Sequence, residues 1–313
     1  MDTQAVQKIL VPIDFSESSM NALHTAIGMA KRQHAQLILL HVVNISPLVN
    51  NKDDGTMISD SNLQTLLDTH QTNLRKLADK ITNEEFIDCR AIIRTGWVCP
   101  EIVRATVDFY ADLIVMGKHG VSGTKEFMMG SNAFNVLKNA YCPVLLVPSH
   151  RRFEAFKTIV YPIRPVEGAI QKYSMARNLL RENDAELIVV GLLENGEKAS
   201  FEMLSQETFK LDKKLKEDNL KSQTGFYYCD SVVAKVLEKT TDFMADLLII
   251  TASIDHHIQD YYVGPFVQQI VHYARVPVLS IRPKPADAFV VKSINEDEEN
   301  SEYPYPVQML GII

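Results

Sequence analysis

Residues 108–117, DFYADLIVMG, recur as DFMADLLIIT at residues 242–251. The match continues without a gap over residues 108–148 and 242–282, where AYCPVLLVP corresponds to ARVPVLSIR. An internal repeat of this length predicts two copies of one structural unit in the chain. The arrangement of strands and helices inside one copy therefore decides the fold of both.

A second pair of segments lies nearer the start of each copy. Residues 8–43 align without a gap on residues 158–193, so that KILVPIDFSES corresponds to TIVYPIRPVEG and HAQLILLHVV to DAELIVVGLL. The spacing between the two aligned blocks is about 16 residues longer in the first copy. Residues 46–60, with their proline, aspartates and glycine, are loop-like and are expected to hold the extra residues.

Short, continuous runs of Val, Ile and Leu alternate with segments of helical period in each copy. Such runs are typical of strands that are covered on both faces of a parallel sheet. In the first copy, the strand-like runs are residues 8–13, 37–43, 89–95, 113–116 and 143–147, and the helical segments are residues 18–32, 63–81, 100–110 and 133–140. The sequence predicts an α/β fold of two tandem, doubly wound, Rossmann-like domains, each with a mainly parallel five-stranded sheet.

The last strand of each copy is strongly apolar, at residues 142–148 and 276–283. An edge strand of this kind is stabilised by pairing, and two copies in one chain allow the pairing to be internal, as an intramolecular pseudo-dimer. We expect domains at residues 1–149 and 150–283. A tail at residues 284–313 has an acidic middle and an apolar end, which favours docking on this chain or on a partner.

Composition limits the classes of partner and compartment. The chain has 313 residues, 46% of them hydrophobic and 23% charged, with a net charge of −7. No dense run of Lys or Arg provides the positive face that nucleic acid requires, and no apolar run has the length of a membrane span. The four cysteines are scattered without metal-type spacing. We therefore expect a cytoplasmic protein with reduced thiols, no nucleic-acid partner and no membrane segment.

The fourth strand of the first copy runs into a glycine motif. Gly117 and Gly120 follow the strand, and Gly130 with Ser131 and Asn132 begins the next helix. Glycines allow the main chain to approach a phosphate, and free amides at a helix N-terminus favour an anion. The motif predicts a phosphate site, the alternative being a glycine-rich turn that only caps the strand and the helix.

Two side chains near this edge have more than one interpretation. Asp14 closes the first strand, where its carboxylate is placed to accept hydrogen bonds from a ribose or to help hold a metal on phosphates; alternatively it caps the following helix. His119, inside the glycine motif, either contacts a phosphate or faces solvent.

These motifs together resemble the universal stress protein family: VPIDFSE at the end of the first strand, LLHVV, the spaced glycines and CPVLLVP. The resemblance covers about residues 6–148 and 156–282, and it implies the adenine nucleotide alpha hydrolase-like form of the fold. It also implies binding of ATP, commonly with Mg²⁺ or Mn²⁺, and dimerisation through the edge strand. The implied binding residues are Pro12, Ile13, Asp14, Val42, Met116, Gly117, His119, Gly120, Gly130, Ser131 and Asn132.

The second copy departs from the motif at most of these positions. Gly117 is replaced by Thr251, Gly120 by Ile254, Ser131 by Pro265 and Asp14 by Arg164, while Gly264 is retained. Proline removes an amide donor, and Thr and Ile obstruct a close approach of the main chain. A triphosphate is not expected there. Three alternatives stay open for Arg164, His256 and His257: they bind a different anion, they bind a lipid, or they bind no ligand.

No sequence pattern pairs a nucleophile with a general base, so the sequence gives little support for catalysis beyond a slow ATPase. The predicted function is an ATP-binding regulatory protein of the stress response, with its site in the first copy. The alternative is a nucleotide-independent module that holds a lipid, a small molecule or a protein in the tandem cleft.

Overall fold

The computed structural model describes residues 6–44, 60–119, 129–150, 152–165, 170, 172–194, 200–251 and 264–281. Internal contacts group Met1–Pro283 into one compact unit and Lys284–Ile313 into another. The predicted tail lies outside the described residues, and the predicted boundary between residues 149 and 150 stays a prediction. Within the described part of the chain, no helix is long and apolar enough to cross a lipid bilayer.

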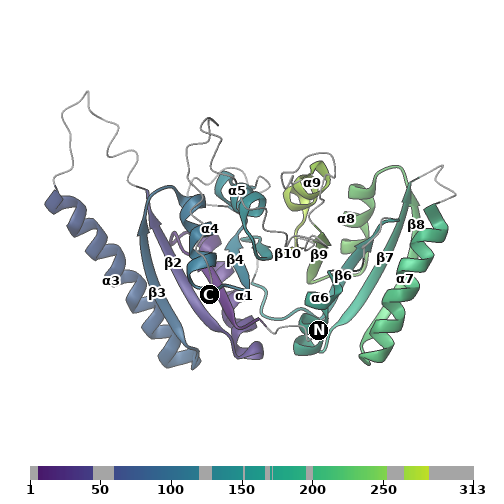
Figure 1. The fold of residues 1–313 in the computed structure, drawn as a ribbon, viewed down its shortest axis with the longest axis horizontal. Coiled ribbons are helices and arrows are strands. Elements are labelled where there is room, and N and C mark those ends of the chain that lie inside the picture. Colours follow the sequence, from purple (N-terminus) through teal and green to yellow (C-terminus); the bar gives the residue numbers. More distant parts are fainter. Residues whose placement is uncertain are drawn as a thin grey trace, which may run out of the picture. The chain divides into compact units, whose positions relative to one another are not determined.

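Strands and helices alternate through both halves (Figure 1). The first half contains β1 (Lys8–Pro12), α1 (Glu17–Gln33), β2 (Gln36–Val43), α3 (Asp60–Glu85), β3 (Cys89–Thr95), α4 (Val98–Asp108), β4 (Leu113–Gly117), α5 (Ser131–Asn139) and β5 (Val144–Val147). The second half contains β6 (Thr158–Ile163), α6 (Tyr173–Asn183), β7 (Glu186–Glu194), α7 (Ser200–Glu217), β8 (Lys221–Cys229), α8 (Val232–Asp242), β9 (Leu247–Thr251), α9 (Pro265–Tyr273) and β10 (Val278–Ile281).

The ten strands of the described residues form one sheet in the order β3-β2-β1-β4-β5-β10-β9-β6-β7-β8. Each half contributes five strands in the same order, and all neighbours inside a half are parallel. The halves join where β5 pairs antiparallel with β10, through Leu145 opposite Leu279. This confirms the predicted fold class and the internal pairing of the two final strands.

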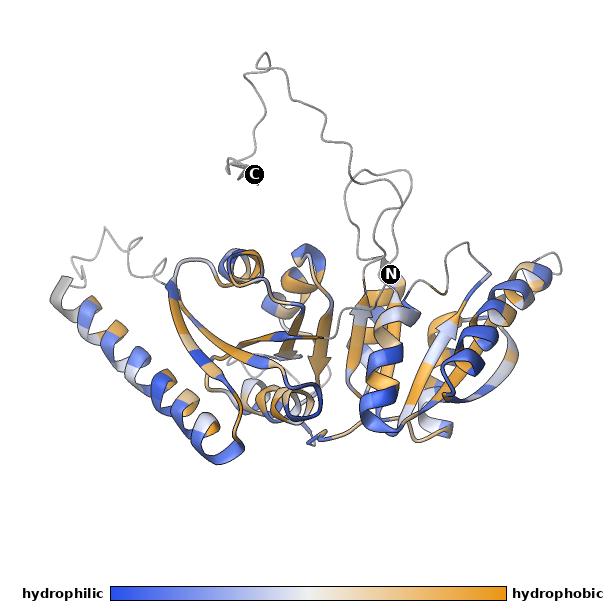
Figure 2. Cartoon of the chain, turned by 60° about the horizontal axis from the view of Figure 1, so that its bottom comes forward, coloured by the Kyte–Doolittle hydropathy of each residue, from blue (hydrophilic) through white to orange (hydrophobic). Residues whose placement is uncertain are grey.

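Two hydrophobic clusters cover the two faces of the sheet. The helices α1, α3, α6 and α7 contribute to one cluster, and α4, α5, α8 and α9 contribute to the other. Figure 2 shows this division, with hydrophobic strands and helices that turn hydrophilic residues away from the sheet. Strands buried on both faces explain the continuous apolar runs in the sequence.

Helix α1 begins and ends at recognisable signals. The side chain of Ser16 accepts a hydrogen bond from the Ser19 amide at 3.2 Å, which caps the N-terminus. His34 adopts a left-handed conformation with φ of 52° and ends the helix. These signals place the start of α1 directly beyond the end of β1.

The longer first half has a partly different cause from the one predicted. Helix α3 has 26 residues, whereas α7, its counterpart in the second half, has 18. Part of the extra sequence is therefore helical, and α3 begins at Asp60, the last residue of the segment expected to be a loop. Residues 45–59 lie outside the described part of the chain.

Candidate functional site

The site is built at the carboxyl ends of two neighbouring strands. β1 pairs with β4 in parallel, with Ile9 opposite Leu113. Helix α1 leaves β1 over one face of the sheet, and α4 enters β4 from the other face. Such a change of face between neighbouring strands is the position at which open α/β sheets bind ligands. Asp14 and Gly117 therefore emerge at the same edge, as predicted.

Asp14 is exposed and bound to the start of α1. Its Oδ1 accepts hydrogen bonds from the Ser16 amide at 3.0 Å and from Ser16 Oγ at 2.5 Å. Burial of the carboxylate raises its pKa, but the hydrogen bonds from Ser16 and Ser19 outweigh burial and leave the pKa below its usual value. The carboxylate is thus ionised at neutral pH. Asp14 supports the helix entrance, although the capping residue itself is Ser16.

Gly117 is needed for packing against Ser18. A Cβ atom at Gly117 would lie 2.4 Å from Ser18 Oγ and 2.8 Å from the Ser18 carbonyl carbon. The next turn of the main chain is held by the same side chain, because the His119 amide donates to Ser18 Oγ at 3.3 Å. The predicted reason for this glycine, a close approach to phosphate, is therefore incomplete: the space beside Gly117 is occupied by α1.

The loop that follows β4 is closed at its base. The Gly130 amide donates to the Lys118 carbonyl at 2.9 Å, which brings the beginning of α5 back to the end of β4. Gly130 is the N-cap residue of α5 and provides no side-chain cap. Ser131 and Asn132, in the first turn, are both exposed. Gly120 lies outside the described residues.

Hydrophobic side chains below this edge lie on different faces of the sheet. Met116 is buried in the cluster beneath α4 and α5, and Val42 packs against the same cluster. Ile13 belongs to the opposite cluster, beneath α1 and α3, and is 2% exposed. Half-buried Pro12 ends β1. Val42 and Met116 share a face with the start of α5, whereas Ile13 presents only its main chain to the edge.

His41 fixes the main chain of Ile13. Its Nδ1 donates to the Ile13 carbonyl at 2.6 Å, and its ring stacks on His70 of α3 with centroids 4.5 Å apart. Burial lowers the pKa of His41, and the hydrogen bond to Ile13 offsets this only in part. No sequence pattern indicated this role of His41, because its partners Ile13 and His70 come from other elements.

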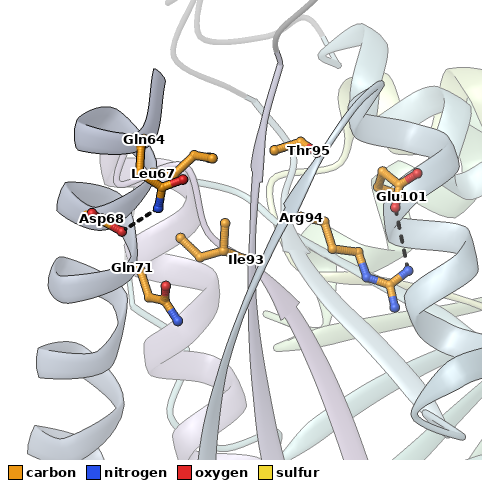
Figure 3. A pocket seen from close by; sticks show the side chains of 8 residues that line it. All are labelled: Gln64, Leu67, Asp68, Gln71, Ile93, Arg94, Thr95 and Glu101. Carbon is orange, nitrogen blue, oxygen red and sulfur yellow. Dashed lines mark hydrogen bonds and ion pairs between the residues drawn. The ribbon is translucent and has the colours of Figure 1, made fainter. Parts of the chain in front are cut away.

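A cavity of about 520 Å³ lies one strand away from the predicted residues, at the carboxyl end of β3 between α3 and α4 (Figure 3). It is lined by Gln64, Leu67, Asp68, Gln71, Ile93, Arg94, Thr95 and Glu101. The Arg94 guanidinium is paired with Glu101 and Asp108, so this cavity is a poor place for a phosphate. It is adjacent to the predicted site through the pairing of Arg94 with Val42.

Lys118 is a residue of the motif that sequence reasoning missed. Its side chain is 5% exposed and reaches the second half, where Nζ donates to the His272 carbonyl at 2.6 Å and to the Ala274 carbonyl at 3.3 Å. Burial lowers its pKa to about 8. No local pattern could have indicated this contact, because the partners are more than 150 residues away.

The corresponding edge of the second half carries different groups. Arg164 lies over the ring of Phe266, with its guanidinium carbon 5.3 Å from the ring centroid. Lys172 donates to the Pro162 carbonyl at 2.7 Å, and burial together with Arg164 lowers its pKa to about 7. Helix α9 begins with Pro265, which offers no amide. Ile254, His256 and His257 lie outside the described residues.

Comparison with known proteins gives one consistent family. A sequence model described as the Universal stress protein family matches residues 5–148. Universal stress protein MJ0531 of Methanocaldococcus jannaschii is 35% identical over 146 residues, which are 47% of this chain and 84% of that protein. Universal stress protein YxiE of Bacillus subtilis is 31% identical over 147 residues, or 45% of this chain and 97% of that protein.

Similarity of fold extends over both halves. The crystal structure of a universal stress protein from Archaeoglobus fulgidus has a TM-score of 0.69 and 19% sequence identity. It covers 90% of this chain, and the match includes 98% of that chain. The strand order of the sheet, the matched sequence segment and these relatives agree, and the chain belongs to the universal stress protein family.

Proposed function

We propose that the first half binds ATP with a divalent cation at the carboxyl edge of β1 and β4, as a regulatory protein of the stress response. The observation that carries this proposal is the closed loop base between Lys118 and Gly130, followed by a helix whose first residues, Ser131 and Asn132, are exposed. A helix start with open amides and a positive dipole end attracts phosphate.

The remaining predicted residues fit the other parts of the nucleotide. Half-buried Val42 lies on the same face as α5 and offers apolar surface for the adenine, and Met116 is buried on that face. Asp14, ionised and exposed at the edge, suits the ribose hydroxyls. In the same proposal, Pro12 and Ile13 border the adenosine through the end of β1, and His119 and Gly120 follow the phosphates.

The cation would be held chiefly by the phosphates. Among the residues that the structure describes, no cluster of three or more His, Cys, Asp or Glu side chains is arranged to hold a metal. Mg²⁺ commonly binds through one or two carboxylates together with the phosphates of its nucleotide. Asp14 lies at this edge and would provide such a carboxylate.

We also propose that the protein is located in the cytoplasm, which is a reducing compartment. All four cysteines are free thiols in the structure. Burial raises the pKa of the Cys89 thiol to about 12 and also raises the pKa values of the Cys99 and Cys229 thiols, which makes their thiolates and their oxidation unfavourable. Such cysteines are structural rather than reactive groups.

Titration calorimetry with Mg²⁺ and ATP tests the site through Ser131→Glu. A carboxylate at the first residue of a helix favours the helix dipole, so the fold should be retained. The same charge repels a triphosphate, and we expect affinity to fall by about tenfold or more. Ser200→Glu, at the first residue of α7, introduces the same charge in the second half and should leave the affinity unchanged.

The alternative, a module that does not use nucleotide, is distinguished in the same experiment. Absence of heat on titration of the wild-type protein with ATP would reject the proposed function. Equal affinity in the wild type and in Ser131→Glu would place the nucleotide elsewhere.

A further inference from the structure

Lys118 connects the loop of the first half to the end of a helix in the second half. Helix α9 ends at Tyr273, and its last carbonyls have no partner inside the helix. Lys118 Nζ donates to the carbonyl of His272, in the last turn, and to the carbonyl of Ala274, the C-cap residue that follows the helix. The ammonium therefore caps the C-terminus of α9 from across the junction between the two halves.

The main chain of the same residue forms the base of the loop. The Lys118 amide donates to the Val147 carbonyl on β5 at 2.9 Å, and the Lys118 carbonyl accepts from the Gly130 amide at 2.9 Å. One residue thus joins the final strand of the first half, the entry to α5 and the end of α9. A displacement of the loop base has to be accompanied by a displacement at α9 or by loss of these bonds.

The second copy of the sequence does not repeat this lysine. In the duplicated sequence the position that corresponds to Lys118 is Ala252, whose side chain has no hydrogen-bond donor. The second half, which lacks the glycine motif, therefore cannot form the reciprocal side-chain contact with α5. The half with the intact motif contacts the half without it.

We propose that Lys118 is a positioning residue that ties the base of the nucleotide loop, at Lys118 and Gly130, to the end of α9, so that the second half supports the ATP site although it lacks the motif itself. This inference rests on the proposed function. It gives the second half a role, because the end of α9 holds the base of the loop in place.

Electrostatics supports a role beyond stability. The C-terminus of a helix carries a partial negative charge, which would repel phosphates bound beside the loop. The Lys118 ammonium neutralises this charge. Burial disfavours the ammonium and lowers its pKa to about 8.

The test compares Lys118→Met, Lys118→Arg and a matched control. Lys172→Met removes another buried lysine that donates to a main-chain carbonyl, but at the edge of the second half. We expect Lys118→Met to bind ATP about tenfold more weakly, a usual size for coupling between sites. Lys118→Arg, which keeps the charge and the donors, should recover most of the affinity. Lys172→Met should bind ATP as the wild type does.

Hydrogen exchange in the wild-type protein provides a second readout. Addition of ATP should slow exchange of the amides in the last turn of α9, residues 270–273, and Lys118→Met should abolish this effect. No change at α9 on ATP binding by the wild type would overturn the inference, even if Lys118→Met fails to fold. Equal ATP affinity in folded Lys118→Met and the wild type would also overturn it.

Failure of the inference can be told apart from failure of the proposed function. If the wild type binds ATP and Ser131→Glu does not, but Lys118→Met has no effect, only the role of Lys118 is rejected. If the wild type binds no ATP, both proposals are rejected together.

Discussion

Gly117 and Ser18 are packed so closely that no side chain fits between them. A Cβ atom at Gly117 would lie within 3 Å of the hydroxyl, the carbonyl carbon and the carbonyl oxygen of Ser18. Two of these atoms belong to the main chain of α1 and cannot rotate away. The end of β4 is therefore fixed directly against the start of α1, and the loop after β4 begins from that contact.

Gly117→Ala should destabilise the fold whether or not nucleotide is present. Insertion of a methyl group into a packed region typically costs about 1–3 kcal/mol. We expect the free energy of unfolding in urea to fall by that amount. Gly225→Ala is the matched control, because the three atoms nearest to its Cβ would all belong to the Tyr227 side chain, which can move. A loss in the control as large as in Gly117→Ala would contradict this explanation.

Asp14→Asn and Asp14→Ala separate the two roles of this residue. Asn keeps an acceptor for the Ser16 amide, so we expect a small change in stability and a clear loss of affinity for ATP with Mg²⁺. Ala also removes the acceptor at the entrance of α1 and should lower the free energy of unfolding by about 1 kcal/mol. Unfolding curves and calorimetry check the two effects. Unchanged ATP affinity in Asp14→Asn would exclude a role for its charge in binding.

His41 should make stability depend on pH on the acid side of neutrality. Burial holds the pKa of His41 below 6.5 in the folded state, so the unfolded chain takes up a proton first as the pH falls. Stability from this group is complete above pH 6.5 and is lost progressively below it. His24 and Asp14 shift in the same direction and contribute their own pH dependence.

Comparison with His41→Gln isolates the effect of His41, because His24, His70 and Asp14 are present in both proteins. Gln keeps an amide donor for the Ile13 carbonyl but does not titrate in this range. We expect the wild type to lose more stability than the variant between pH 7.5 and pH 5.5 in urea unfolding. Parallel losses in the two proteins would show that His41 does not titrate as described.

Buried strands could be predicted because each one requires a continuous apolar run in its own segment of the sequence. The strand-like runs ending at Ile13, Met116 and Val147 agree with β1, β4 and β5 to within one residue, since strands covered on both faces need continuous apolar sequence. β8, Lys221–Cys229, has no such run. It is an edge strand with alternating exposed residues, and only its pairing with β7 defines it.

The meeting of the glycine-motif residues at one edge was predictable from the sequence, but the contacts that hold them there were less so. The spacing of Gly117, Gly130 and Ser131 located the loop, and these residues do come together. The contact between Gly117 and Ser18 and the link from Lys118 to α9 depend on packing between elements that are distant in sequence. No periodicity or motif in one segment contains that information.

Backbone amide chemical shifts during a titration with Mg²⁺ and ATP test the central claim most directly. We expect large shifts for the amides of Ser131 and Asn132, at the start of α5, and much smaller ones for Phe266 and Val267, at the start of α9. Saturable binding with no shift at Ser131 and Asn132, or with the larger shifts at α9, would contradict the assignment of the ATP site to the first half.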